Sequence, residues 1–308
     1  MGQMGQNFMA DHLKILVWIV VLCVVSLHGQ EELRNHILCS NQKTRDVLVM
    51  DVNGDWSKPE SILWKWNPEG DPNIPPESLK RFNHIDETKV VNNGTQILVT
   101  SSHGGMALVD VATKQSVFTG YPGGSTHSAD LLPDGTIITA SSTGNFLMVF
   151  TRKDGEKTAH KTFKLTFADA HGVVWDQVHG LVWAVGREAL ICCRYNFDYE
   201  NPQLSIVESF PLKPNPYGGH DLSLLKKENK LILTGRNVQE FDTMTGQSRL
   251  FLNRKNVKSV SIHPATGSQL MQLPKEKWWS DTLTEMNGEK RTWTIPNSVI
   301  YKGRWFVY

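Results

Sequence analysis

Short apolar stretches separated by turn residues run through almost the whole chain. Runs rich in Val, Ile, Leu, Thr and aromatic residues recur between turns of Gly, Pro, Asn and Asp, which is the pattern of β-strands. No long stretch has the 3.6-residue hydrophobic period of an amphipathic helix. The pattern therefore predicts an all-β protein.

Three segments share one design. Each begins with a histidine, continues through a short apolar strand, a turn and a second strand, and ends with a tight turn and a third strand; the segments are "THSADLLPDGTIITASSTGNFLMVF", "AHGVVWDQVHGLVWAVGREALICC" and "GHDLSLLKKENKLILTGRNVQEFD". Aligning the turns gives units of about 40 to 45 residues, the size of a four-stranded propeller blade. The second to sixth units run over Arg81–Gly124, Ser125–Phe167, Ala168–Pro214, Asn215–Arg254 and Lys255–Asn297.

The first unit is incomplete. His36–Cys39, Val47–Val52 and Ile62–Trp66 supply only three strands, and the unmatched tail Ser298–Tyr308 has the composition of the missing innermost strand. Pairing the last strand beside the first closes the ring and removes two exposed sheet edges. The sequence predicts a six-bladed β-propeller closed by its C-terminal strand. The alternative of seven blades requires another unit, for which the chain is too short.

The N-terminus has a different pattern. Lys14 precedes an apolar run that ends at Leu27, and a run of about thirteen residues suits the hydrophobic region of a secretory signal peptide better than a membrane-spanning helix. We interpret residues 1–29 as a signal peptide and 30–308 as a single propeller domain, which predicts a secreted or periplasmic protein that meets the membrane only through this segment. An uncleaved N-terminal anchor is the alternative.

The overall charge argues against nucleic-acid partners. The chain has 32 Lys and Arg against 31 Asp and Glu, a formal net charge of +1, so no basic field marks a nucleic-acid surface. It also has no phosphate-binding loop and no dinucleotide fingerprint, which argues against nucleotides. Three cysteines, Cys39, Cys192 and Cys193, follow the predicted leader, and we interpret them as small buried hydrophobic residues.

The predicted fold assigns residues to the two faces of the disc. The beginnings of the innermost strands share a face with the turns between the second and third strands of each blade, so His127, His171 and His220 are expected to converge around the central opening. The turns at Asn92, Leu132, Asp176, Lys226 and His263 fall on the other face and are of the kind that simply reverses a chain. His179 and His263 are therefore excluded from the site.

Charged and polar residues accompany the histidines on the expected site face. The other innermost-strand beginnings carry Asp86 or Glu87, Lys258, and Lys302 or Arg304; the second-to-third-strand turns add Gln42, His103, Asn145, Arg187, Arg236 and Glu276. Trp278, Trp279 and Trp305 are candidates for a wall on which sugar rings stack, whereas Trp64, Trp66 and Trp183 are expected to pack between blades.

Two kinds of chemistry fit this set. His127, His171 and His220 with Asp86 form a nitrogen-rich ligand set for one divalent metal ion, Zn²⁺, Mn²⁺ or Ca²⁺. Alternatively, the imidazoles transfer protons while Arg187, Arg236 and Lys258 neutralise an anionic substrate, with Tyr217 as the acid. A uronic acid suits the second reading, because removing the proton beside its carboxylate needs a cation, a base and an acid. Each histidine alone also fits a hydrogen-bonded cap at a strand start.

Several strings of the chain resemble a known group of proteins. "ILCSNQKTRDVLVMDV", "THSADLLPDGTIITASSTGNFL", "HGVVWD", "GGHDLS", "VKSVSIHPATG", "EKWWSDT" and "IYKGRWF" are similar to an uncharacterised family of secreted, propeller-like bacterial proteins. The resemblance covers nearly the whole mature chain and implies no activity. A looser similarity of architecture and residue type links the chain to oligogalacturonate lyases and ulvan lyases, seven-bladed propellers with histidines on one face; no motif aligns residue by residue.

Three hypotheses about function follow. The first is a secreted or periplasmic carbohydrate-active enzyme, a lyase or hydrolase that acts on an acidic oligo- or polysaccharide through His127, His171, His220 and Tyr217. In that enzyme, Gln42, His103, Asn145, Arg187, Arg236, Lys258, Glu276, Trp279 and Arg304 bind the substrate. The second is a non-catalytic propeller that binds a glycan or a protein through the same face. The third is a purely structural interaction module.

Overall fold

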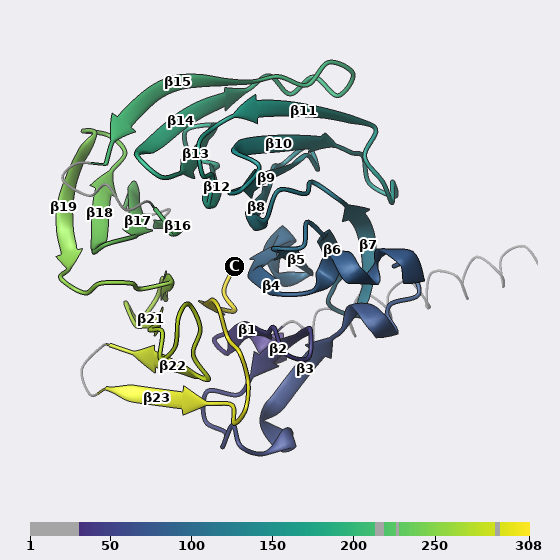
Figure 1. The fold of residues 1–308 in the computed structure, drawn as a ribbon, viewed down its shortest axis with the longest axis vertical. Helices are drawn as coiled ribbons and strands as arrows, with labels where there is room; N and C mark the ends of the chain where they lie inside the picture. Colours follow the sequence, from purple (N-terminus) through teal and green to yellow (C-terminus); the bar gives the residue numbers. More distant parts are fainter. Residues whose placement is uncertain (1–30, 213–218, 226–227, 287–289) are drawn as a thin grey trace, which may run out of the picture.

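The structure is a computed structural model that describes residues 31–212, 219–225, 228–286 and 290–308. The predicted leader, residues 1–29, and the candidate acid Tyr217 lie outside the described residues. Over the described ranges, six four-stranded antiparallel sheets are arranged around a central axis as the blades of a propeller (Figure 1). The predicted fold class and the predicted number of blades are confirmed.

Each blade is a simple meander from the axis outwards. Blade 2 contains β4 (Ile85–Val91), β5 (Gln96–Ser101), β6 (Met106–Asp110) and β7 (Gln115–Gly120); blade 3 contains β8 (Thr126–Leu131), β9 (Ile137–Ser141), β10 (Phe146–Thr151) and β11 (Lys161–Thr166); blade 4 contains β12 (Gly172–Asp176), β13 (Leu181–Val185), β14 (Ala189–Tyr195) and β15 (Leu204–Pro211). Blade 5 contains β16 (Asp221–Leu225), β17 (Lys230–Thr234), β18 (Val238–Asp242) and β19 (Gln247–Leu252); blade 6 contains β20 (Ser259–Ile262), β21 (Gln269–Gln272), β22 (Thr282–Glu285) and β23 (Arg291–Thr294).

Blade 1 is assembled from both ends of the described chain. Its strands β1 (Ile37–Asn41), β2 (Asp46–Met50) and β3 (Ile62–Trp66) are completed on the inside by β24 (Gly303–Trp305), which pairs antiparallel to β1 with Leu38 opposite Arg304. The C-terminus therefore lies at the centre of the ring (Figure 1). The predicted closure by Ser298–Tyr308 is confirmed, with the strand itself confined to three residues.

Short 3-10 helices connect the strands where proline and glycine interrupt the β pattern. Three of them, η1 (Pro59–Ser61), η2 (Pro68–Gly70) and η3 (Pro76–Phe82), flank β3 and lead into blade 2, and each has proline in its first turn. The fourth, η4 (Asn92–Gly94), makes the turn between β4 and β5.

The apolar core lies between the blades. Every pair of neighbouring blades encloses one cluster of buried apolar side chains in the described part of the chain. Between blades 1 and 2, for example, Val49 and Trp64 pack with Ile97 and Val109. Both faces of a blade are thus covered, which explains why the strands read as nearly continuous apolar runs rather than as an alternation.

Polar side chains line the axis and complete the hydrogen bonding of the innermost strands. These strands leave one backbone edge unpaired by another strand, and a buried N–H or C=O without a partner is costly. The hydroxyl of Ser259 accepts from the Gly303 N–H, that of Ser261 accepts from the Trp305 N–H, and Asp221 accepts from the Val260 N–H. Side chains of one blade therefore join the backbone of the next around the channel.

Candidate functional site

The three histidines converge on one face, at the mouth of the central channel. The rings of His127 and His171 are stacked, with centroids 4.6 Å apart and planes within 7°. The ring of His220 stands at 80° to that of His171, with centroids 4.9 Å apart. The convergence that the repeat predicted is thus present in the structure. We call this side of the disc the histidine face.

Two β-bulges place Asp86 and His127 at the mouth. The pairing of β4 with β5 shifts between Ile85 and Glu87, and the pairing of β8 with β9 shifts between Thr126 and Ser128. The residue skipped in each case is Asp86 or His127, and a bulge re-aims the side chain of the extra residue. Glu87 points into the channel instead, so of the two predicted alternatives Asp86 occupies the mouth.

Asp86 holds His127 in one orientation. Its carboxylate lies 3.1 Å from His127 Nδ1, accepts from Gln42 Nε2 at 2.6 Å, and accepts from the hydroxyl of Ser102. The carboxylate is 2% exposed, so it is fixed and screened from water. In the neutral ring this bond places the proton on Nδ1 and leaves the lone pair on Nε2.

The contacts continue around the mouth and involve every blade, with one residue from each of blades 1 to 5 and two from blade 6. Trp278 of blade 6 donates from Nε1 to Gln42 Oε1 of blade 1 at 3.4 Å, and Gln42 binds Asp86 of blade 2. Asp86 binds His127 of blade 3, and the ring contacts lead through His171 of blade 4 to His220 of blade 5. Lys258, also from blade 6, is the last residue of this chain of contacts, because its Nζ lies 2.9 Å from His220 Nε2.

The surroundings of His171 and His220 favour neutral rings. Burial and then the neighbouring His127 lower the pKa of His171 to about 4. Burial and then Lys258 lower the pKa of His220 well below its ordinary value. A neutral His220 accepts from Lys258 through Nε2, and its buried Nδ1 has no hydrogen-bond partner among the described residues.

Lys258 is a cation close to neutral pH. Burial and then the charge of Lys302 lower its pKa to about 8. Most of its population is therefore protonated at pH 7, at a place where the two nearest imidazoles are uncharged. The mouth therefore holds a buried positive charge beside two uncharged rings.

Tyr301 is a component of the mouth that the sequence analysis missed. Its buried ring lies 5.7 Å from that of His127. Burial and then the carboxylate of Asp86 raise the pKa of this phenol well above its usual range, which keeps it protonated. The sequence did offer one indication of this role, since Tyr301 lies two residues before the closing strand and next to Lys302. The tyrosine that the sequence favoured, Tyr217, lies outside the described residues.

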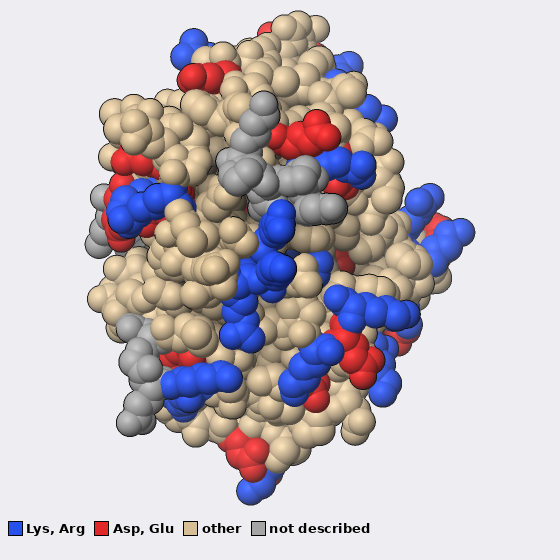
Figure 2. Space-filling model, turned by 60° about the vertical axis from the view of Figure 1, so that its left-hand side comes forward, with Lys and Arg blue, Asp and Glu red and all other residues tan. Residues whose placement is uncertain are grey.

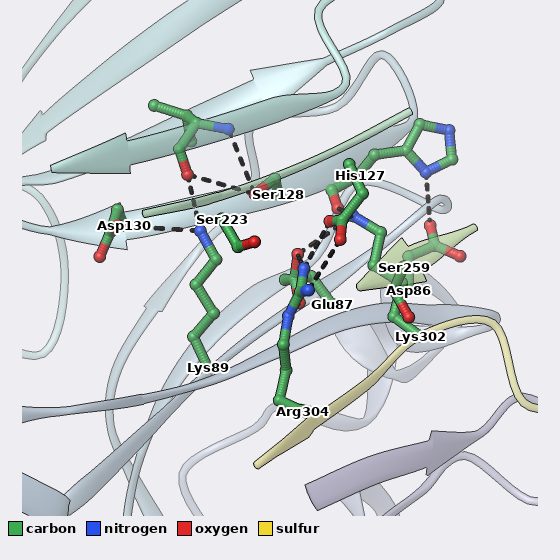
Figure 3. A network of polar contacts seen from close by, with 12 residues as sticks. Asp86, Glu87, Lys89, His127, Ser128, Asp130, Ser223, Ser259, Lys302 and Arg304 are labelled. Atoms are coloured by element: carbon green, nitrogen blue, oxygen red, sulfur yellow. Dashed lines mark hydrogen bonds and ion pairs between the residues drawn. The ribbon is translucent and has the colours of Figure 1, made fainter. Parts of the chain in front are cut away.

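A buried charge cluster forms the floor below the histidines (Figure 3). Arg304 donates to both carboxylate oxygens of Glu87, at 3.0 and 2.7 Å, and to both of Asp221, while Lys302 Nζ lies 3.0 Å from Glu87 and 3.2 Å from Asp221. Burial raises the pKa values of both carboxyl groups, but Arg304 and Lys302 lower them more, so both remain ionised. Arg304 was predicted to bind substrate at the mouth; the structure places its guanidinium inside the channel, engaged by carboxylates.

Other predicted residues lie on the rim of the same face. Arg187 is 62% exposed in its side chain and donates from Nε to Asp169 at 3.4 Å. Asp169 also approaches His171, so Arg187 is tied to the site through one carboxylate. Arg236 is exposed and makes no hydrogen bond or ion pair with the described residues.

The remaining predicted rim residues contact neighbouring loop residues and not the three histidines. Asn145 accepts from the Asp169 N–H and so shapes the loop before β12. His103 is exposed and packs edge-on against His84, with ring centroids 5.0 Å apart. Glu276 is exposed and bridges to Trp279 within the loop between β21 and β22.

The predicted wall of three tryptophans is not formed. Trp278 is 41% exposed on the histidine face, whereas Trp305 is 7% exposed and packs edge-on against Trp293 and His263. Trp305 lies on β24, whose end points to the other face of the disc.

Among the described residues, no group of three or more His, Cys, Asp and Glu side chains is arranged to hold a metal ion. At the three histidines, the orientation of the rings explains why they do not form a metal site. A metal ion lies about 2.0–2.1 Å from a ligating nitrogen, close to the plane of its imidazole. The nearly parallel planes of His127 and His171 share no such point unless one ring rotates.

The opposite face is not the plain set of turns that the sequence suggested. A cavity of about 430 Å³ opens there, lined by Lys89, Asp130, Trp175 and Tyr308 among others. Lys89 donates to the Val173 carbonyl at 2.6 Å and lies 3.7 Å from Asp130 (Figure 3). The channel therefore has two mouths, with the charge cluster between them.

Basic side chains also gather on one part of the surface. Figure 2 shows Lys and Arg in a short column near the middle of that view, with acidic side chains scattered around it.

In the described ranges, no helix has the length and apolarity needed to cross a membrane.

Three comparisons place the chain among known proteins. A family model described as "Family of unknown function (DUF6528)" matches residues 31–308. No curated protein matches. Among solved structures, the chain is similar to the hydrazine synthase of Kuenenia stuttgartiensis at 12% identity and a TM-score of 0.49, over 68% of this chain and 64% of that one. The chain thus spans less than two thirds of that protein's length, and a likeness at this level carries no argument about function.

Proposed function

The chain belongs to the DUF6528 family, whose function is unknown, and we propose that its histidine face binds an acidic glycan and catalyses proton transfer on it. The observation that carries the proposal is the chain of contacts around the mouth, from Trp278 through Gln42, Asp86 and the three histidines to Lys258. The buried charge cluster already joins the blades below the mouth. The contacts between the histidines and their neighbours are therefore not needed to hold the ring of blades together.

His127 carries the proton in this proposal. Asp86 fixes the ring through Nδ1, so Nε2 is the atom that takes a proton from the substrate or from water. Asp86 also stabilises the imidazolium that forms, because the carboxylate is buried and already aligned. Tyr301, a phenol whose raised pKa keeps its proton on the hydroxyl, donates a hydrogen bond to the leaving oxygen in this proposal, and His127 returns the proton to that oxygen.

Cations on the same face supply the affinity for a carboxylate. Lys258 lies in the chain of contacts at the mouth, and Arg187 and Arg236 lie on the rim with exposed side chains. Trp278 offers an exposed aromatic face beside Gln42. Cations with an adjacent aromatic ring suit a sugar that bears a carboxylate, such as a uronic acid. Export through the predicted leader would bring the protein to such glycans.

The test is turnover of a panel of uronate-containing glycans by the full chain, with and without added Zn²⁺, Mn²⁺ or Ca²⁺. Unsaturated uronate ends, followed by ultraviolet absorbance, report a lyase, and new reducing ends without them report a hydrolase. We expect His127→Ala to lower the rate by about 10²–10⁴-fold, the usual loss for a general acid–base group. His160→Ala, at an exposed pair with Glu200, is the matched control and should retain the rate.

An intact panel under all conditions would overturn the catalytic proposal. Binding without turnover, weakened by Arg187→Ala or Trp279→Ala but not by changing the histidines, would instead identify a non-catalytic glycan-binding propeller. The exposed Arg236 and Trp278 are the features that favour this second function.

A further inference from the structure

The loop before β8 places a serine hydroxyl next to His127. Ser125 Oγ lies 3.5 Å from His127 Nε2, the ring nitrogen that faces away from Asp86. On its other side, His127 Nδ1 lies 3.1 Å from Asp86 Oδ2. Serine, histidine and aspartate thus follow one another in the order hydroxyl, imidazole, carboxylate.

We propose that Ser125, His127 and Asp86 form a nucleophilic triad that hydrolyses a carboxylic ester. This inference rests on the proposed function in one respect, since it uses the same base, His127, and it names the bond that is attacked. The triad is recognised by geometry and roles, and its members occur in any chain order. A separation of 3.5 Å is loose, as hydrogen bonds of catalytic groups often are without substrate.

The backbone around Ser125 fits a nucleophile. Gly123, Gly124 and Ser125 have φ angles of 73°, 65° and 60°, and a serine in this left-handed region is held there by its surroundings. A Cβ at Gly124 would come within 2.7 Å of Gly144 Cα, so the loop is locked against the next turn of blade 3. Ser125 is partly exposed, which leaves its hydroxyl open to a substrate.

Donors for the oxyanion lie in the same loop. The Gly124 and Ser125 N–H groups donate to no group of the described residues, whereas the Ser125 carbonyl accepts from the Ser142 N–H at 3.0 Å. Backbone N–H groups beside a nucleophile are the usual stabilisers of the charge that develops on the attacked carbonyl oxygen. Here they flank Ser125 Oγ within one residue.

The reaction balances with water as the only co-reactant. Ser125 Oγ attacks the carbonyl carbon and its proton passes to His127 Nε2; the bond to the alcohol oxygen then breaks, and His127 returns the proton to that oxygen. Water attacks the resulting acyl-serine through the same base, which releases the acid and restores the hydroxyl. Together with the cations of the rim, this points to an ester carried by an acidic glycan.

The experiment is covalent labelling of the full chain with a fluorophosphonate probe, mapped by mass spectrometry, beside hydrolysis of p-nitrophenyl acetate. We expect one adduct, at Ser125, and at least about a hundredfold slower labelling and hydrolysis in His127→Ala. Ser125→Gly removes the hydroxyl while tolerating the φ of 60°, so its fold should persist and its labelling should be lost. Ser205→Ala, on the exposed outer strand β15, is the matched control.

The outcomes separate this inference from the proposed function. No adduct at Ser125, or labelling that is indifferent to His127→Ala, would overturn the triad even if a glycan is turned over. An adduct at Ser125 that depends on His127, with every glycan backbone left intact, would support the triad and count against cleavage of the glycan chain.

Discussion

Arg304 lies at the centre of the buried charge cluster. It is buried and binds Glu87 and Asp221 at once, and Lys302 shares both carboxylates. Burial by itself would lower the pKa of Arg304, but Asp221 and Glu87 raise it, so the guanidinium stays charged. The four charges cancel, and this neutrality is what makes a buried cluster tolerable.

Removal of this guanidinium should be strongly destabilising. Arg304→Met leaves two buried carboxylates with Lys302 alone, and breaking a buried ion pair typically costs about 3–5 kcal/mol. The free energy of unfolding, measured with denaturant, should fall by that amount. Lys65→Met, which breaks the half-exposed pair with Asp46, should change it by at most about 1 kcal/mol. Equal losses in the two variants would contradict the assigned role of the cluster.

The closing strand β24 is the element that completes the ring of blades. It is short, yet it supplies the innermost strand of blade 1, packs Trp305 against blade 6, and delivers Arg304 to the axis. Without it, the inner edge of β1 has no strand to pair with, and the ring of six blades is no longer closed.

Deletion of residues 298–308 should therefore abolish cooperative unfolding, as followed by circular dichroism during heating, and should produce aggregated material in size-exclusion chromatography. Deletion of Tyr308 alone, a residue that is 40% exposed, is the control and should leave an unaggregated protein with a similar melting temperature. A truncated chain that melts like the whole protein would show that closure does not depend on β24.

The blades were predictable from the sequence because each carries its own turns. The repeat placed every blade correctly, and the unmatched tail marked the strand that closes the ring. The two bulges were not predictable, since strict alternation does not say which residue of Asp86 and Glu87 is extra. Nor could the repeat show that Arg304 meets two carboxylates below the mouth, or that the ends of the innermost strands enclose a cavity on the far face.

At the scale of the whole molecule, stability should depend on pH through the neutral histidines. The pKa of His171 is about 4 in the fold and 6.5 in the unfolded chain, so between these values the unfolded state binds more protons. Stability is then lost as the pH falls from about 6.5 to about 4, and His220 acts in the same direction.

The size of this loss follows from the shift. One pKa unit corresponds to about 1.4 kcal/mol, so His171 alone contributes on the order of 3 kcal/mol. Denaturant titrations across this pH range measure it, and His171→Gln should flatten the profile. Lys258, with a pKa lowered to about 8, predicts a further rise in stability above pH 8. A wild-type profile that is flat below pH 6.5 would contradict the buried, neutral state of these rings.

The molecule presents two openings to a ligand, and the proposed function requires the ligand to bind at the histidine face. Calorimetric titration of an oligouronide into the full chain shows which opening is used. We expect Arg236→Ala to raise the dissociation constant about tenfold, the value of one lost charge-assisted contact. Gln177→Trp, which narrows the opposite cavity, should leave it unchanged. Weaker binding in Gln177→Trp with none lost in Arg236→Ala would place the ligand on the opposite face and contradict the proposed function.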